Sequence, residues 1–211
     1  LFEGTGNSAS GNPSVISKIR WFIPEQDEFR YVSLVDGSGL HGATQRSEIL
    51  TSVDGSDWDK IIGKHYDNVT GEIVKRGISV EDVDFFMFGF SRGAYAARWL
   101  ASLIQFSGIP KGDDAPRHKM FVNHLENRKD NAEKFREEGF AWDDVPIDFL
   151  GVWDTVEASV DPSFDITDVP AQLKSVYHAL AIDEWRYTFK PTRFNPSDKV
   201  KEAWFPGCHT D

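Results

Sequence analysis

The stretch Val83–Ala97 constrains the fold of this 211-residue chain more than any other part of the sequence. It opens with the apolar run Phe85–Phe88 and continues directly into Gly89–Gly93, which reads G-F-S-R-G. A short continuous apolar run is typical of a strand that is buried on both faces, as in a parallel sheet. The pentapeptide matches G-x-S-x-G, in which a serine stands on a sharp turn between a strand and a helix. The sequence therefore predicts an α/β fold with Ser91 raised at the end of a strand.

A helix is expected directly after this serine. Ala94–Gln105 is rich in strong helix formers and carries its apolar residues on one stripe. The N-terminus of such a helix points its N–H groups and its positive dipole end toward Ser91, which favours a developing negative charge. The pentapeptide alone is common by chance, and a plain turn after a buried strand is the alternative. The strand before it and the helix after it favour a nucleophile.

Composition narrows the range of partners. The net charge is −11, with 34 acidic and 23 basic residues, so the surface repels phosphate backbones and a nucleic-acid partner is not expected. A lipid substrate stays open, because a lipase can work from a local apolar mouth with transient contact to a membrane surface. Cys208 is the only cysteine, which excludes an internal disulfide and a thiolate metal cage. No apolar run reaches transmembrane length and no signal-peptide pattern is present, so localisation stays open.

The chain predicts one domain. No internal repeat, low-complexity tract or linker interrupts residues 1–211, which fit a single catalytic α/β domain with a mostly parallel sheet and helices on both faces. Leu1-Phe2 resembles the end of a strand, and the sequence stops two residues after His209, so a domain truncated at both ends is expected. The charge-dense segment 117–140 is expected to be helical, either as a cap over the active site or as solvated surface helices.

Other elements are expected around the elbow. Ser14 is a candidate N-cap for a short helix, and Asp57 is one for a long helix that ends at Gly77. Further strands are expected at Phe29–Val35, Val145–Asp154 and Val200–Phe205, and a further helix over Ala171–Arg186.

Residues Gly37–Gly42 match G-x-G-x-x-G and raise the alternative of a dinucleotide-binding dehydrogenase. That function requires the third glycine to open a helix packed on the strand. Ala43–Thr51 is polar and lacks apolar periodicity, so a surface loop near the substrate is the preferred interpretation and no cofactor is expected.

A serine hydroxyl is a poor nucleophile at neutral pH, so it needs a base, and the base needs an orienting acid. In α/β-hydrolases the three residues occur in the order Ser, Asp or Glu, His, each on a loop after a strand. Ser91, Asp154 and His209 each follow an expected strand in that order. These three residues are the predicted catalytic set.

Several competitors remain at this point. His178 falls inside an expected helix and His41 inside the glycine-rich loop, and each is a weaker candidate for the base. Asp211 lies two residues from His209 and is the alternative acid. No cluster of His, Asp and Glu has metal-ligand spacing, so no metal site is expected.

The oxyanion of an acyl-transfer intermediate needs preorganised N–H donors. The N–H of Arg92, the residue after the nucleophile, is the expected first donor, and the loop Gly4-Thr5-Gly6 is the candidate source of the second. Arg98 is a candidate contact for a substrate phosphate, with a structural role as the alternative.

Five ordered segments resemble the catalytic domain of type VI secretion lipase effectors and their many uncharacterised bacterial and fungal relatives. They are Leu1–Asn7, Gly89–Arg98, Phe149–Val156, His178–Glu184 and Trp204–Asp211. The resemblance implies an α/β-hydrolase fold, a triad of Ser91, Asp154 and His209, and phospholipase activity as in the characterised effectors. The chain departs from the family pattern at Glu3, where Asp is usual, at Glu157, where Gly is usual, and at Cys208, where a small aliphatic residue is common.

The sequence therefore predicts a serine hydrolase that cleaves carboxylic esters through an acyl-enzyme, with lipid esters as the first candidates for its substrate. The alternative from another class is a catalytically silent hydrolase-like domain that binds a partner or a lipid. A dehydrogenase ranks third.

Overall fold

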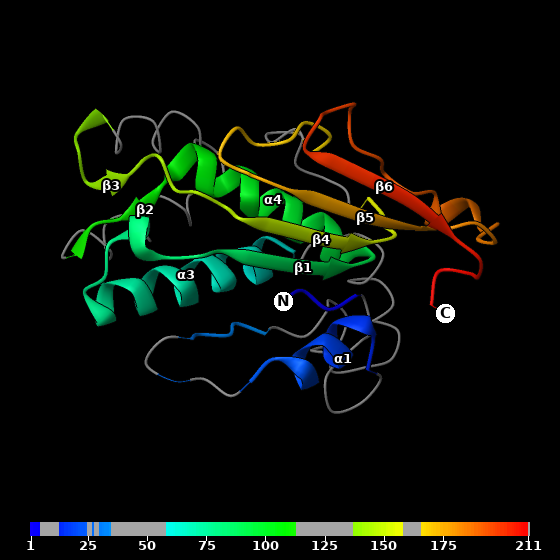
Figure 1. The fold of residues 1–211 in the computed structure, drawn as a ribbon, viewed down its shortest axis with the longest axis horizontal. Helices are drawn as coiled ribbons and strands as arrows, with labels where there is room; N and C mark the ends of the chain where they lie inside the picture. Colours follow the sequence, from blue (N-terminus) through cyan, green and yellow to red (C-terminus); the bar gives the residue numbers. More distant parts are fainter. Residues whose placement is uncertain are drawn as a thin grey trace.

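The computed structural model describes residues 1–4, 13–24, 27, 30–34, 58–112, 137–157 and 166–210. The helices in these ranges are α1 (Val15–Phe22), α3 (Trp58–Arg76) and α4 (Arg92–Ser107), with short 3₁₀ turns η1 (Val80–Asp82) and η4 (Tyr187–Phe189). The strands are β1 (Phe86–Phe90), β2 (Ile109–Pro110), β3 (Ala141–Trp142), β4 (Phe149–Trp153), β5 (Val176–Ala181) and β6 (Val200–Phe205). Figure 1 shows their arrangement.

The main sheet has the strand order β1-β4-β5-β6, and each neighbouring pair is parallel. All four arrows therefore point the same way in Figure 1, and their carboxyl ends lie along one edge of the sheet. Phe2 forms an isolated parallel bridge with Gly89 on the other side of β1. β2 and β3 pair antiparallel in a separate small sheet. Loops that follow β1, β4 and β6 are thus brought to a common edge.

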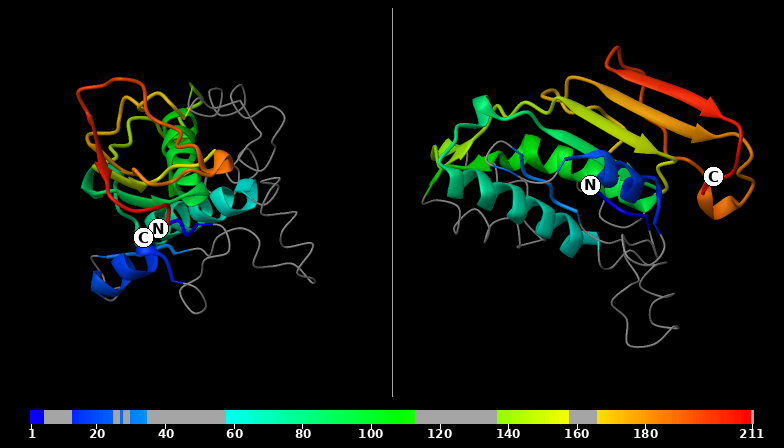
Figure 2. Two further views of the ribbon diagram at one scale, coloured as in Figure 1. Left: turned by 90° about the vertical axis from the view of Figure 1, so that its right-hand side faces the viewer. Right: turned by 60° about the horizontal axis from the view of Figure 1, so that its bottom comes forward.

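Helices cover both faces of the sheet, as the sequence predicted (Figure 2). Met87 and Val152 belong to the apolar core that includes α4, with α3 packed beside α4. Phe90 faces the opposite way and packs against Ile16 of α1. Because neighbouring side chains of a strand point to opposite faces, these contacts place α4 and α1 on opposite sides of the sheet.

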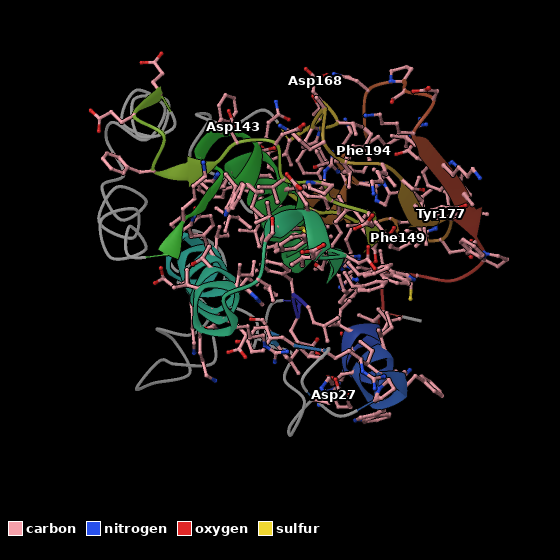
Figure 3. All side chains as sticks on the ribbon, turned by 60° about the vertical axis from the view of Figure 1, so that its left-hand side comes forward. Asp27, Asp143, Phe149, Asp168, Tyr177 and Phe194 are labelled. Carbon is pink, nitrogen blue, oxygen red and sulfur yellow. The ribbon has the colours of Figure 1, made fainter. Side chains whose placement is uncertain are left out.

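Away from α1, aromatic side chains lie on this second face. The rings of Phe149 and Tyr177 lie side by side, with centroids 5.5 Å apart, and both are labelled in Figure 3. Phe86 is 60% exposed and Tyr177 is 45% exposed. Among the described residues, α1 therefore covers only the part of this face near the carboxyl end of β1.

Most of the expected elements near the elbow are confirmed. Ser14 is the N-cap of α1, and its Oγ accepts a hydrogen bond from the N–H of Ile16 at 3.0 Å. α3 ends before Gly77, which has a φ of +64° as a helix-ending glycine often does. β6 has the predicted bounds, whereas β4 is shorter than the predicted strand.

Two predictions were wrong. The segment Ala171–Arg186 is not a helix, because it contains β5. Val176, His178 and Leu180 are buried and alternate with more exposed residues, so the apolar pattern has the two-residue period of a strand. Its apolar residues also fit a helical stripe, and pairing with β4 and β6 decides between the two. Residues 30–34 were expected within a strand, but they form no regular element, and the backbone oxygen of Ser33 accepts from the N-terminus of Leu1.

The remaining predictions fall largely outside the described residues. Most of the helical segment 117–140 and all of the loop Gly37–Gly42 lie there. The prediction of a single domain also stays a prediction.

Candidate active site

Ser91 stands on a sharp turn between β1 and α4. Its φ of 58° lies in the left-handed region, which costs a non-glycine residue about 1–3 kcal/mol. Neighbouring backbone groups hold this turn in place. The N–H of Ser91 donates to the carbonyl oxygen of Trp153 at 2.9 Å, and its own carbonyl oxygen accepts from Ala94 and Val156 at 3.1 and 3.2 Å.

The two glycines of the motif let backbone segments approach the serine. A Cβ on Gly89 would lie 2.6 Å from the Cα of Ala94, so any side chain there would push α4 off the strand. A Cβ on Gly93 would collide with the carbonyl oxygens of Phe2 and Glu3. Glycine at both positions is therefore a steric requirement of this turn.

The backbone of Phe2 and Glu3, which packs against Gly93, is held in place by hydrogen bonds to α1. The carboxylate of Glu3 is buried and accepts hydrogen bonds from the hydroxyls of Ser14 and Ser17 at the start of α1. Gly4 follows it and is buried beside this contact. Of the expected oxyanion donors, Arg92 is the first residue of α4 and Gly4 is described, whereas Thr5 and Gly6 lie outside the described residues.

Asp154 stands on a second strained turn, directly after β4, with a φ of 41°. Both its backbone and its carboxylate bind to β5. The N–H of Asp154 donates to the carbonyl oxygen of Ala179 at 2.8 Å, and its Oδ1 accepts from the N–H of Ala181 at 2.7 Å. The second carboxylate oxygen, Oδ2, is left to face the histidine.

His209 follows β6 and joins the two turns. Its Nε2 lies 2.7 Å from the Oγ of Ser91, and its Nδ1 lies 3.2 Å from Oδ2 of Asp154. Since a carboxylate only accepts, Nδ1 carries the ring proton and Nε2 accepts from the serine hydroxyl. The ring packs against Phe90 and Phe189, each with its centroid 4.8 Å away. The structure thus brings together all three residues that the sequence singled out, and all three are buried.

The backbone of His209 has its own anchor, which the sequence did not reveal. Its N–H donates to Oε2 of Glu184 at 3.3 Å. The hydrogen bond from Arg186 to Glu184 lowers the pKa of that carboxyl to about 2, so Glu184 is ionised at neutral pH. A carboxylate held in place by Arg186 therefore fixes the loop that carries His209.

The competing residues have other places. His178 lies on β5, and its Nε2 accepts from the N–H of Thr155 at 3.2 Å. The guanidinium of Arg98 is buried and donates to the carbonyl oxygens of Ile166 and Thr192, so it serves the protein's own backbone. His41 and the alternative acid Asp211 lie outside the described residues.

A cavity of about 470 Å³ adjoins the acid and the histidine. Its walls combine apolar side chains with polar and charged ones, among them Lys18 of α1. The lining includes Val15, Phe90, Trp153, Asp154, Leu180, Phe205 and His209.

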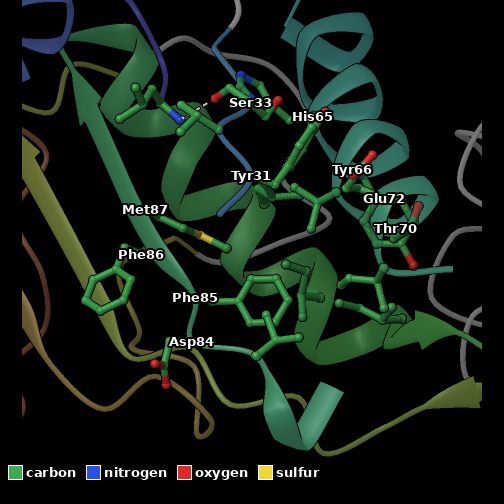
Figure 4. A pocket seen from close by; sticks show the side chains of 18 of the residues that line it. Tyr31, Ser33, His65, Tyr66, Thr70, Glu72, Asp84, Phe85, Phe86 and Met87 are labelled. Atoms are coloured by element: carbon green, nitrogen blue, oxygen red, sulfur yellow. Dashed lines mark hydrogen bonds between the residues drawn. The ribbon is translucent and has the colours of Figure 1, made fainter. Parts of the chain in front are cut away.

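A larger cavity, of about 600 Å³, lies apart from these residues (Figure 4). It runs between α3, the start of β1 and residues 30–33, and Tyr31, His65 and Phe85 are among its lining residues. Neither Ser91 nor His209 lines it. Of these two cavities, the smaller one is the one that adjoins members of the predicted catalytic set, Asp154 and His209.

Within the described ranges, no three His, Cys, Asp or Glu side chains lie close enough to hold a metal ion. None of the described helices has the length and apolar character needed to cross a membrane.

Known proteins resemble this chain in sequence and in fold. The family described as "T6SS, Phospholipase effector Tle1-like, catalytic domain" matches residues 1–211. The chain is 31% identical over 134 residues to the uncharacterized protein YEL023C of Saccharomyces cerevisiae. The matched region covers 56% of this chain and 20% of the yeast protein.

A solved structure, the Tle1 effector bound to the VgrG spike from the type 6 secretion system, has the same fold. Its TM-score is 0.54 at 22% sequence identity, and the match covers 95% of this chain and 40% of that chain. The chain thus spans a minor part of each of these two proteins.

Proposed function

This chain belongs to the Tle1-like phospholipase effector catalytic domain family, and on that basis we propose that it is a serine hydrolase that cleaves carboxylic esters of lipids. The observation that carries the proposal is the continuous hydrogen-bonded path from Ser91 through His209 to Asp154. Nucleophile, base and orienting acid meet in the order and geometry that acyl transfer requires.

Ser91 is the proposed nucleophile. As its Oγ attacks the ester carbonyl carbon, Nε2 of His209 takes the hydroxyl proton over the 2.7 Å contact. The resulting tetrahedral oxyanion collapses and expels the alcohol, which receives that proton from His209. An acyl-enzyme on Ser91 remains. Water then attacks it with His209 again as the base, and the carboxylic acid leaves while the serine hydroxyl is restored.

Asp154 orients the base. Its Oδ2 accepts from Nδ1 of His209, which keeps the proton off Nε2 and stabilises the imidazolium that forms. Its Oδ1 is already engaged by the N–H of Ala181, so the carboxylate has little freedom to turn away. The acid is thus preorganised before substrate arrives.

The oxyanion is assigned to donors at the start of α4. The N–H of Arg92 is next to the nucleophile, and the Gly4-Thr5-Gly6 loop is the proposed source of a second donor because the preceding backbone lies directly against Gly93. Losing one such donor raises the barrier by about 3 kcal/mol in other serine hydrolases.

The substrate class comes from the family, whose description names a phospholipase. The cavity beside His209 has apolar lining from Val15, Leu180 and Phe205, which suits part of an acyl or alkyl chain. We therefore propose phospholipid esters as substrates, reached by transient contact with a membrane surface.

The test is turnover of a soluble p-nitrophenyl butyrate and of phosphatidylcholine vesicles by wild type and by Ser91→Ala. We expect the wild type to hydrolyse both and the variant to hydrolyse neither while it keeps a native circular-dichroism spectrum. Release of fatty acid and lysophospholipid, measured by mass spectrometry, identifies the bond that is cut. A wild type that binds lipid vesicles but hydrolyses no ester would instead identify a silent binding domain.

A further inference from the structure

We infer that His178 is a positioning residue of the active site, because it holds the backbone turn that carries Asp154 from the neighbouring strand. This inference rests on the proposed function, since it assigns a role in the same reaction. His178 does not contact the substrate-facing atoms and acts through the residue that follows the acid.

The central contact joins β5 to the acid turn. Nε2 of His178 accepts from the backbone N–H of Thr155, the residue directly after Asp154, at 3.2 Å. Both residues are almost completely buried, at 1% and 0% exposure, so no water is at hand to replace this acceptor. A buried N–H without an acceptor costs about 1–3 kcal/mol, so the turn is strongly biased to the geometry that meets the histidine.

The acceptor role fixes the tautomer of His178. Since Nε2 accepts a proton, the ring hydrogen is on Nδ1, which donates to Oε1 of Glu202 at 3.0 Å. Glu202 is the direct partner of His178 in the pairing of β5 with β6. Its own carboxylate is held by Arg193, whose Nε donates to Oε2 at 2.7 Å. A chain of hydrogen bonds thus runs from the outer strand β6 to the acid turn.

Burial keeps the ring of His178 neutral. Burial, with a smaller contribution from Arg98 on α4, lowers the pKa of His178 to about 4, against opposing effects of Glu202 on β6 and Asp154 after β4. A protonated ring would present an N–H to the N–H of Thr155, and the hydrogen bond would be lost. At neutral pH the side chain is therefore a stable acceptor.

The position of Thr155 matters to both halves of the site. Before it, Asp154 has the strained φ of 41°. After it, the N–H of Val156 donates to the carbonyl oxygen of Ser91 at 3.2 Å. The carbonyl oxygen of Thr155 is bound by the N–H of Thr192 at 2.7 Å, so His178 supplies the restraint on the other side of the same residue. Releasing the N–H of Thr155 would free the acid and the serine turn together.

The decisive variants are His178→Leu, which keeps an apolar side chain but has no acceptor, and His178→Gln, whose amide can accept from Thr155 and donate to Glu202. With p-nitrophenyl butyrate we expect His178→Leu to lower kcat by roughly 10- to 100-fold with little change in KM, because the acid is misplaced and binding is not. His178→Gln should stay within about threefold of wild type. The matched control is Tyr66→Phe, which removes a buried hydrogen bond to Gly108 at the far end of α4 and should leave kcat unchanged.

A double-mutant cycle separates positioning from general damage. If His178 acts through the acid, His178→Leu should reduce the residual kcat of Asp154→Asn by less than about twofold, whereas independent damage would add in full. Full additivity, or an unchanged kcat in His178→Leu, would overturn the inference.

Hydrogen exchange of the Thr155 amide gives a readout that needs no activity. We expect this amide to be protected in wild type and His178→Gln, and to exchange at least about tenfold faster in His178→Leu. If the wild type hydrolyses no ester, the proposed function fails, and exchange alone then decides whether His178 holds the turn. Equal exchange in wild type and His178→Leu would overturn the inference in either case.

Discussion

The turns after β1 and β4 each hold a residue at positive φ, and they are stabilised by different contacts. Ser91 and Asp154 both have positive φ values, 58° and 41°, at the carboxyl ends of neighbouring parallel strands. The serine turn is held by backbone that approaches through two glycines. The aspartate turn has no such glycine, and its restraints include hydrogen bonds with the backbone of Ala179 and Ala181 and with the side chain of His178.

The difference explains which turn can be recognised from sequence. A turn held by close backbone contact needs glycine at fixed offsets, so the residues that stabilise it can be recognised beside it in the sequence. A turn held by a side chain on another strand leaves no local mark, because His178 is 23 residues from Thr155. Both turns must keep their shape for the proposed relay through His209, and a substitution can act first on one of them even though the hydrogen bond from Val156 to Ser91 links the two.

The largest expected effect comes from the acid itself. Asp154→Asn should lower kcat about 10⁴-fold, because an amide can donate to Nδ1 and shift the histidine to the wrong tautomer. Steady-state kinetics on p-nitrophenyl butyrate measure this, with Asp211→Asn as the matched control. If Asp211→Asn abolishes turnover and Asp154→Asn does not, the acid has been assigned to the wrong residue.

The serine turn should fail through sterics. Gly93→Ala places a Cβ against the carbonyl oxygens of Phe2 and Glu3, so we expect a loss of about 1–3 kcal/mol of stability and at least ~100-fold in kcat. Urea unfolding and kinetics measure the two losses. Gly71→Ala on α3 is the control, since its Cβ would have open space, and it should stabilise the helix by up to about 1 kcal/mol. Equal behaviour of the two variants would contradict the role given to Gly93.

Because His178 supports the aspartate turn, the stability of the protein should depend on the pH range in which His178 is protonated. His178 has a folded pKa of about 4, below the unfolded value of 6.5, so the unfolded chain binds the proton first as pH falls. The contribution of neutral His178 to the free energy of unfolding is fully present above pH 6.5 and is lost as the pH falls toward 4. This loss is ~3 kcal/mol, and His178→Gln should not show it. Urea unfolding of both proteins over this range isolates the difference, because the pKa of the buried His65 is lowered equally in each. Parallel stability profiles would show that His178 is not buried in neutral form.

The smallest effect is expected from a substitution at the N-terminus of α1, which contacts Glu3 beside the serine turn. Ser14→Ala removes the N-cap of α1 and one of the hydroxyls bound to Glu3, so we expect a loss of about 1 kcal/mol in the free energy of unfolding. Thermal unfolding measures it, and kcat should change far less than in Gly93→Ala. A kcat loss as large as that of Gly93→Ala would mean that Glu3 supports catalysis more directly.

The sequence predicted the strand–serine–helix unit and the convergence of Ser91, Asp154 and His209, because parallel strands bring their following loops to one edge. It failed at β5. The apolar residues of that segment also fit a helical stripe, and pairing with β4 and β6 selects the strand. Because the segment was expected to be a helix, the contact of His178 with the turn after β4 was not predicted. It also hid Glu184, whose contact with the backbone of His209 joins two distant loops.

The central claim is that Ser91 is the nucleophile of a working relay, and covalent labelling tests it most directly. The wild type should react with a fluorophosphonate probe, and peptide mapping by mass spectrometry should find the adduct on Ser91 alone. Labelling should disappear in Ser91→Ala and slow sharply in His209→Ala, because the hydroxyl then lacks its base. An adduct on another residue, or equal labelling of Ser91→Ala, would contradict the account.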